Sequence, residues 1–374
     1  MKFIPYGKQT IDEEDIASVV KVLQSDFLTT GPQVAAFEQT ICEFTGAAYC
    51  VAVANGTAAL HLASLVLLDK NDTVLTTPNS FLATSNSILY VGAIPKFVDI
   101  CEDGNIDLDL CEKYLRKDNS IKALYGVHFS GNPLNQTKLK NLRETYKIKI
   151  LEDCAHSLGA IFDGIQAGSC QNSDCSILSF HPVKHITTGE GGAITTNSKE
   201  IYEKLLTLRA HGMVKTQDMK PWEYEMRELG FNYRITDFAC ALGISQFAKL
   251  PNFIQKRKEL AQNYDKLFQN TIIKPLYPLS ENSSYHLYVV RVDFTKLSIT
   301  KEEIFIKMRE ANIGLQLHYI PINKQPYYKS LGYGNEQTPI MDRYYAECFS
   351  LPCYPLLTHS EQEYVVELLI QLLK

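Results

Sequence analysis

The chain has 374 residues, of which 45% are hydrophobic and 21% charged, so it is long enough for two folded domains and does not have a disordered composition. A net charge of -5 and a pI near 6.0 have the wrong sign for binding nucleic-acid phosphates, and no long run of Lys and Arg occurs. Neither a signal peptide nor a run of about 18 apolar residues is found, so we expect a cytoplasmic protein with no membrane or nucleic-acid partner.

Apolar runs rich in β-formers alternate with helix-patterned segments up to about residue 200. Helices are expected over residues 12–23, 34–44 and 58–68. Strands are expected over residues 50–54, 73–76, 95–99, 123–128, 148–152, 175–179 and 193–196. Such alternation predicts an α/β fold, with a mostly parallel sheet flanked by helices.

The pattern changes after about residue 240. One long helix is expected over residues 244–268, interrupted near Pro251, and then strands over 285–293 and 315–319 and helices over 301–311 and 360–373. This less regular order predicts a smaller α+β domain. We therefore divide the chain into an N-terminal arm with a large domain, residues 1–245, and a linking helix with a small domain, residues 246–374.

Ten cysteines are spread along the chain without a C-x2-C pair. Without paired ligands at finger-like spacing, buried free thiols explain them better than a metal site or disulfides, and we expect no metal.

Lys184 stands among Pro, Val, Ile and hydroxylic residues and is followed by a Gly-rich turn. Neighbours that exclude water disfavour the ammonium form and leave the amine free to attack a carbonyl. The competing interpretation is a partly buried lysine paired with Glu190.

Two further segments carry chemical groups. Asn55-Gly-Thr-Ala58 lies between an expected strand and helix, where it can form an anion cradle or simply cap the helix. Asp153 and His156 follow another expected strand, where ligands of open sheets collect, although Asp153 could also cap a turn. A strand-end carboxylate, a desolvated lysine and an anion turn are together what pyridoxal 5'-phosphate requires.

The chain also resembles the DegT/DnrJ/EryC1/StrS family of nucleotide-sugar aminotransferases over nearly its whole length. The resemblance is carried by Asn55-Gly-Thr-Ala-Ala-Leu60, Thr77-Pro-Asn-Ser-Phe81, Asp153-Cys-Ala-His156, Ser179-Phe-His181, Arg209-Ala-His-Gly212, Gly230-Phe-Asn-Tyr-Arg234 and His318-Tyr-Ile-Pro321. It implies the aspartate-aminotransferase type I fold. Among members, those of the pseudaminic acid pathway are most similar, except that Asn-Gly-Thr-Ala and His185 replace their Asn-Ser-Ala-Thr and Pro.

The resemblance implies a role for each matching position. Lys184 holds the cofactor aldehyde and moves the substrate proton, and Asp153 binds the pyridine nitrogen. The remaining implied cofactor contacts are Gly56, Thr57, Ala58 and Ser179 at the phosphate, Phe81 and His156 at the ring, and Asn232 from a second subunit of a homodimer. His318 and Tyr319 match positions that contact the sugar nucleotide.

The implied reaction moves an amino group from L-glutamate to the C4 keto group of a UDP-linked 4-keto-6-deoxy-N-acetylhexosamine. Alternatives within the family are a legionaminic acid precursor, perosamine or a 3-amino sugar. A silent cofactor-binding regulator would keep Asp153 and Lys184, whereas a related dehydratase would usually lack the lysine. A nicotinamide oxidoreductase is disfavoured because no G-x-G-x-x-G follows the first strand.

Overall fold

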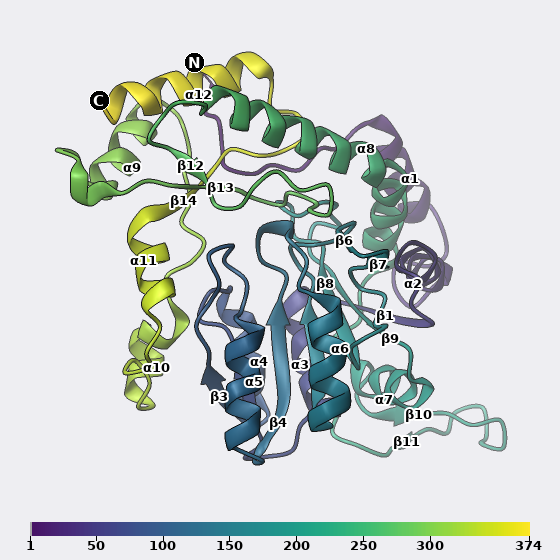
Figure 1. The fold of residues 1–374 in the computed structure, drawn as a ribbon. Coiled ribbons are helices and arrows are strands. Elements are labelled where there is room, and N and C mark those ends of the chain that lie inside the picture. Colours follow the sequence, from purple (N-terminus) through teal and green to yellow (C-terminus); the bar gives the residue numbers. More distant parts are fainter. Residues whose placement is uncertain (1) are drawn as a thin grey trace.

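The large domain is built on a seven-stranded sheet, whose strands spread from left to right behind two helices in Figure 1 of the computed structural model, which describes residues 2–374. The strand order is β1-β9-β8-β5-β4-β2-β3. The strands are β1 (Tyr49–Val53), β2 (Thr73–Thr76), β3 (Ile94–Phe97), β4 (Ile121–Val127), β5 (Lys149–Asp153), β8 (Cys175–Ser179) and β9 (Gly192–Thr196). Strands from β8 to β3 pair in parallel, and only β9 runs against both of its neighbours. The expected mostly parallel sheet is thus confirmed.

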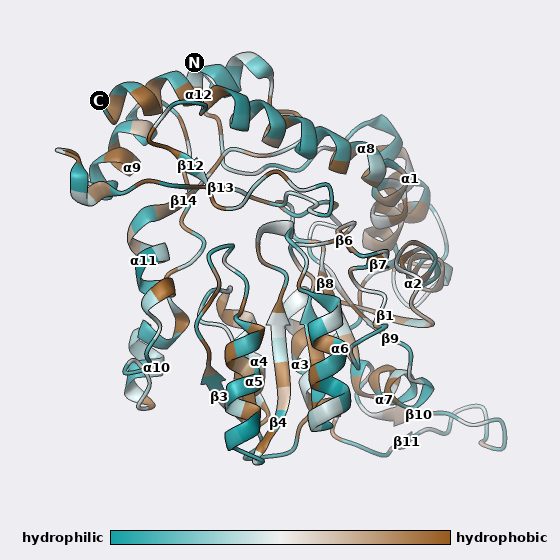
Figure 2. Cartoon of the chain, viewed as in Figure 1, coloured by the Kyte–Doolittle hydropathy of each residue, from teal (hydrophilic) through white to brown (hydrophobic). Residues whose placement is uncertain are grey.

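Helices cover both faces of this sheet. They are α2 (Pro32–Thr45), α3 (Gly56–Leu67), α4 (Leu82–Tyr90), α5 (Leu108–Lys117), α6 (Gln136–Tyr146) and α7 (Lys199–Arg209), whereas α1 (Glu13–Leu23) packs against the long helix that follows residue 236. Successive strand residues point to opposite faces, so Val74 packs under α3 and Leu75 packs under α5 and α6. The outer sides of α5 and α6 are hydrophilic in Figure 2.

The small domain lies at the top and down the left side of Figure 1, and it contains a three-stranded antiparallel sheet ordered β12-β13-β14. Its elements are α8 (Asp237–Leu267), β12 (Lys274–Pro275), β13 (Tyr288–Arg291), α9 (Lys301–Glu310), α10 (Pro326–Ser330), α11 (Pro339–Glu347), β14 (Cys348–Leu351) and α12 (His359–Leu372). Its core also contains Ile4, which is 1% exposed and forms a parallel bridge with Ile313. The N-terminal segment therefore belongs in part to this domain.

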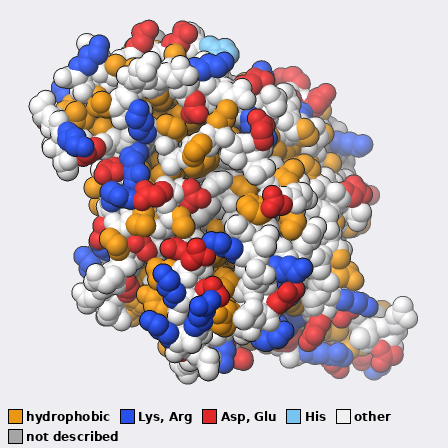
Figure 3. Space-filling view, in the orientation of Figure 1, with side chains coloured by type: hydrophobic (Ala, Val, Ile, Leu, Met, Phe, Trp, Pro, Cys, Tyr) orange, Lys and Arg blue, Asp and Glu red, His pale blue; other side chains and the backbone are white. Residues whose placement is uncertain are grey.

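Short elements complete the chain. They are the hairpins β6 (Ile161–Phe162) with β7 (Ile165–Gln166) and β10 (Met213–Val214) with β11 (Glu225–Met226), and the 3-10 turns Phe129–Gly131, Phe294–Lys296 and Ile322–Lys324. No described helix is long and apolar enough to cross a bilayer. On the face shown in Figure 3, basic and acidic side chains are interspersed.

Two sequence expectations about elements were wrong. Helix α8 starts at Asp237 and continues through Pro251, because Leu250 and Phe253 are buried against the large domain and hold the helix across the missing N–H. The expected strand over residues 315–319 forms only an isolated bridge between Gln316 and Ser350. The proposed division after residue 245 falls within α8.

Candidate active site

A cavity of about 1130 Å³ opens where the carboxyl ends of β5 and β8 and the start of α3 face residues 316–319. Its lining includes ten of the residues expected from the sequence: Gly56, Thr57, Ala58, Phe81, Asp153, His156, Ser179, Lys184, His318 and Tyr319. Segments far apart in the chain therefore meet at one site. Asn232 does not line the cavity, although Tyr233 does.

The start of helix α3 forms one wall. Asn55 caps this helix, with its side-chain oxygen accepting a 2.8 Å hydrogen bond from the backbone N–H of Ala58. A Cβ at Gly56 would lie 3.0 Å from the Cβ of Ser179, so glycine permits the close approach of strand β8. The first N–H groups of a helix have no acceptor within the helix. Here the residues that carry them line the cavity together with Thr57 and Ser179, which bring hydroxyl groups. The segment thus caps the helix and also borders the cavity.

Lys184 lies in the turn after β8, where its backbone N–H donates a 2.9 Å hydrogen bond to the carbonyl of His181. Across residues 2–374, no ion pair forms between Lys184 and Glu190, which is exposed. The alternative of a lysine held by Glu190 is therefore wrong. Burial is the main cause that lowers the pKa of Lys184 to about 8, while the Asp153 carboxylate opposes this shift.

Asp153 is the last residue of β5 and is 5% exposed. One carboxylate oxygen accepts a 2.6 Å hydrogen bond from the Thr84 hydroxyl, and the other accepts a 3.1 Å bond from the N–H of Ala155. Burial raises the pKa of Asp153 despite these donors. A cation placed against this carboxylate would restore the charged form.

Thr84 was missed by the sequence interpretation. It is buried on α4, and Oγ1 also lies 2.8 Å from the Ser80 hydroxyl, so Ser80, Thr84 and Asp153 form one chain of hydrogen bonds. The spacing from Ser80 to Thr84 is a weak signal by itself, because Ser80 lies before the start of α4 and Ser and Thr side chains often form local hydrogen bonds.

His156 and Tyr319 meet on the opposite side of the cavity. The Tyr319 hydroxyl lies 3.0 Å from Nε2 of His156, and the two rings are nearly parallel, at an angle of 25°. Burial and the nearby Lys184 hold the pKa of His156 well below its usual value, so its ring is neutral. Tyr319 also faces Phe81, with 6.3 Å between ring centroids, although Phe81 itself is 59% exposed.

His318 is buried between the N-terminal segment and β14. Its Nδ1 lies 2.8 Å from the Ser350 hydroxyl, and its ring packs edge-on against Tyr6 at 5.2 Å. Burial lowers its pKa to about 3. Tyr6 lines the cavity and was not expected from the sequence.

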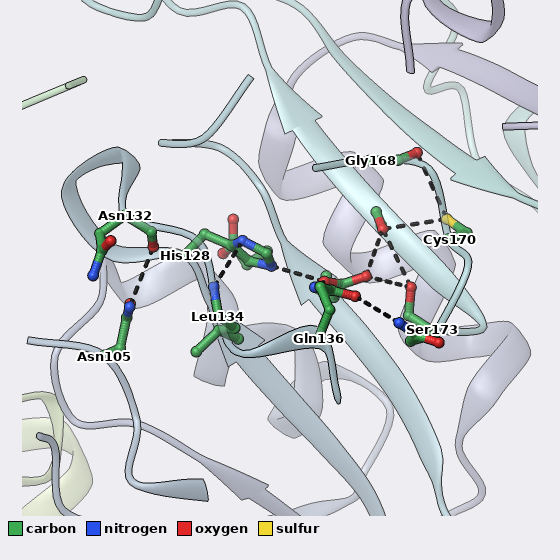
Figure 4. A network of polar contacts seen from close by, with 12 residues as sticks. Asn105, His128, Asn132, Leu134, Gln136, Gly168, Cys170 and Ser173 are labelled. Atoms are coloured by element: carbon green, nitrogen blue, oxygen red, sulfur yellow. Dashed lines mark hydrogen bonds and ion pairs between the residues drawn. The ribbon is translucent and has the colours of Figure 1, made fainter. Parts of the chain in front are cut away.

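A buried polar network holds β5 from the other face of the sheet (Figure 4). The carboxylate of Glu152, next to Asp153, accepts hydrogen bonds from Gln136 at 2.5 Å and Ser173 at 2.6 Å and lies 2.9 Å from Nε2 of His128. Burial opposes the charge on His128, but Cys154 and Glu152 outweigh it and raise its pKa to about 10. The network fixes the strand end that carries Asp153.

Cysteines take no part in a metal cluster. All ten are free thiols, and only Cys101 is exposed, with Cys42 half-buried. Within residues 2–374 no group of three or more His, Cys, Asp or Glu is arranged to hold a metal ion.

A mostly parallel sheet with a strand-end carboxylate, an unpaired lysine and a helix start around one cavity is the arrangement expected of an aminotransferase that uses pyridoxal 5'-phosphate. The match to known families is more specific: residues 9–370 fit the model of the DegT/DnrJ/EryC1/StrS aminotransferase family, and the chain belongs to that family. The resemblance and the fold class expected from the sequence are thereby confirmed.

Individual relatives of the chain are aminotransferases that act on sugars. The chain is 39% identical to the UDP-4-amino-4,6-dideoxy-N-acetyl-beta-L-altrosamine transaminase of Campylobacter jejuni, over 99% of this chain and 98% of that one. Helicobacter pylori PseC, an aminotransferase of pseudaminic acid biosynthesis, superposes with a TM-score of 0.92 at 32% identity, covering 100% of this chain and 99% of PseC. A proposed sugar aminotransferase from Streptococcus pneumoniae, solved in a PLP-form, has a TM-score of 0.89 at 29% identity, covering 99% and 98%.

Proposed function

We propose that the protein uses pyridoxal 5'-phosphate to transfer the amino group of L-glutamate to C4 of a UDP-linked 4-keto-6-deoxy-N-acetylhexosamine. The products are 2-oxoglutarate and a UDP-linked 4-amino sugar, of the kind named in the Campylobacter relative. The observation that carries the proposal is Lys184, which has a lowered pKa, lacks an ionic partner and shares one cavity with Asp153 and the start of α3. Use of this sugar in pseudaminic acid synthesis follows from the likeness to PseC.

The residues fit the cofactor at its phosphate and at its ring nitrogen. The N–H groups of Gly56 and Thr57 and the Ser179 hydroxyl suit the phosphate, and Asp153 suits the protonated ring nitrogen. When bound, the cofactor supplies the aldehyde that exchanges amino groups and the ring that accepts the electron pair.

The chain's own residues then account for proton handling. The amine of Lys184 is near its pKa at neutral pH, so Nζ can take the proton from the glutamate α-carbon and later return one to the sugar C4. Thr84 keeps the Asp153 carboxylate in one orientation. Tyr319 and His318 border the space beyond His156, where we place the sugar.

The negative charge of the substrates supports a site that a second subunit completes. Lys184 is the only Lys or Arg among the residues that line the cavity of the described chain, yet a UDP-sugar and glutamate carry phosphates and carboxylates. Asn232 is exposed beside cavity-lining Tyr233, and the preceding segment exposes Trp222 and Leu229 at 73% and 77%. We propose a homodimer in which this segment covers the partner and Asn232 reaches the partner's cavity.

A cytoplasmic location stays a prediction, tested by cell fractionation.

A spectroscopic assay tests the reaction. The purified protein loaded with cofactor should show a visible absorbance band that glutamate converts to a shorter-wavelength form, and only the correct keto sugar should restore it. A panel of UDP-linked and other nucleotide-linked 3-keto and 4-keto sugars then distinguishes the proposed substrate from a legionaminic precursor, perosamine or a 3-amino sugar. No response to glutamate in a protein that binds the cofactor would identify a silent regulator. Lys184→Ala is the control that should abolish the band.

Mixing two inactive variants tests the shared site. In a mixed dimer of Lys184→Ala and Asn232→Ala subunits, one site carries both substitutions and the other carries neither if Asn232 crosses the interface. Activity should then return on mixing under subunit exchange. If Asn232 served its own subunit, each site would keep one defect and no activity would return.

A further inference from the structure

A second cavity lies behind Lys184. It has a volume of about 10 Å³, and its lining includes Lys184, His185, Thr10 and Gln246, from the N-terminal segment, the turn after β8 and helix α8. Lys184 also lines the front cavity, so the lysine borders both spaces. A volume of this size corresponds to about one water molecule.

Three histidines connect the two cavities. His156 lines the front cavity and His185 lines the rear one, and His286 lies between them, with ring centroids 4.3 Å from His156 and 5.5 Å from His185. Their exposed fractions are only 4%, 3% and 3%. We call His156, His286 and His185 the histidine column.

Every ring of the histidine column has a buried nitrogen without a protein partner. The Nδ1 atoms of all three lack one, and so does the hydroxyl of Thr10 at the rear cavity. Nε2 of His185 lies 3.2 Å from the Ser284 carbonyl, which can only accept, so a neutral His185 carries its proton on Nε2 and offers Nδ1 as an acceptor. Buried polar atoms of this kind are typically satisfied by ordered water.

The histidine column is uncharged. Burial, together with the positive charges of Lys184 and Arg257, holds the pKa of His185 and His286 well below the usual value. Arg257 is 1% exposed and donates to the carbonyls of Tyr285, His286 and Cys353, at 3.3, 3.1 and 2.7 Å. Arg257 therefore fixes the segment that carries His286. Because these partners are carbonyl groups and not carboxylates, they bring no negative charge near the histidine column.

We propose that the histidine column and the water it binds form a proton route between Nζ of Lys184 and the rear cavity. In one passage the Nζ ammonium gives a proton to a water molecule and becomes the free amine. That water gives one proton to a second water, which Nδ1 of His185 and the Thr10 hydroxyl hold in the rear cavity, and this second water releases one to the solvent. Each imidazole is neutral before and after, and no oxidant or reductant is needed. The route lets the lysine exchange protons when a substrate fills the front cavity, and it rests on the proposed function.

Isotope retention measures this exchange directly. The cofactor-loaded protein is reacted once with glutamate carrying deuterium at C2, in ordinary water, and the deuterium in the released pyridoxamine phosphate is measured by mass spectrometry. Wild type should lose most of the label, because the deuteron on Lys184 exchanges with solvent. His185→Phe keeps a ring but removes both nitrogens, and should retain severalfold more label.

Thr10→Val is the second variant. It keeps the shape of the side chain, lies away from the reacting atoms and removes the unpartnered hydroxyl. It should also raise the deuterium retention above that of wild type. His359→Asn, an exposed histidine of α12, should leave retention unchanged. If both His185→Phe and Thr10→Val lose label as wild type does, the proton route is wrong. If His185→Phe does not fold or does not bind the cofactor, Thr10→Val and His185→Asn are compared with wild type instead. Higher deuterium retention in both supports the proton route, and wild-type retention in both contradicts it. If wild type gives no half-reaction with glutamate, the proposed function fails instead.

Discussion

The hydroxyl of Thr84 donates a 2.6 Å hydrogen bond to the carboxylate of Asp153, across the gap between helix α4 and strand β5. Both side chains are buried, at 1% and 5% exposed, so solvent has little access to either group. The bond sets the direction in which the carboxylate faces the cavity.

Replacing Thr84 by Val keeps the shape and removes this donor. We expect the free energy of unfolding of the apoprotein to fall by about 1–2 kcal/mol, and cofactor affinity to fall as well, because the Asp153 carboxylate loses its orientation. Urea unfolding and cofactor titration measure the two effects. Thr84→Ser retains the hydroxyl and should remain close to wild type in affinity; equal losses in both variants would show that packing, and not the hydrogen bond, matters.

Capture of cofactor by the apoprotein should depend on the pKa of Lys184. Only the free amine attacks the aldehyde, so the rate should rise with pH and level off above about 8. The Asp153 carboxylate raises this pKa, and Asp153→Asn should therefore move the midpoint to lower pH. Stopped-flow absorbance across a pH series gives the midpoint. Asp163→Asn, the same change in an exposed turn, should leave it in place.

Breaking the buried pair beneath Asp153 should destabilise the fold. Glu152→Gln leaves His128 without its carboxylate, which we expect to cost about 3 kcal/mol of unfolding free energy. The pKa of His128 is raised from 6.5 to about 10 in the native protein, so this contribution is fully present below pH 6.5 and is lost as the pH rises through about 10. The difference from wild type in denaturant unfolding should shrink over that range, and a difference that stays constant would contradict the role given to the charged pair.

Pro251 lies in the exposed middle of α8 and cannot donate the hydrogen bond that an amide N–H would make at this position. We expect Pro251→Ala to raise the free energy of unfolding by about 1–2 kcal/mol. Helix propensity favours Ala over Pro by about 3 kcal/mol, and the greater freedom of the unfolded chain without proline offsets about 1 kcal/mol of this gain. Thermal unfolding of the apoprotein measures the gain. A lower Tm would mean that the local geometry of α8 requires proline.

Most of the sheet was predictable because its strands are short apolar runs between clear helical patterns, such as residues 73–76, which form β2 with the expected bounds. Pro251 misled the prediction since burial of Leu250 and Phe253 outweighs the local propensity of proline. The segment 315–319 alternates like a strand, but apart from the bridge at Gln316 it faces the cavity and does not pair.

The site was predictable where residue type and strand end coincide, as for Asp153, and where apolar neighbours surround a lysine, as for Lys184. Thr84 and Arg257 were missed because their roles come from partners distant in sequence, Asp153 and the carbonyls around Tyr285. Asn232 is still a prediction, since a single chain shows only that its side chain is exposed. A sequence pattern records the chemistry of a side chain but not the distant groups that meet it.

Ile4 precedes the entire large domain in the sequence, yet it is buried among residues from position 260 onward. During synthesis the N-terminal segment therefore cannot pack into its native position until almost the whole chain has left the ribosome. The core of the small domain closes only when residues from opposite ends of the sequence meet. Premature arrest of translation would thus leave a formed large domain with its N-terminal arm undocked, an accessible target for proteases and chaperones.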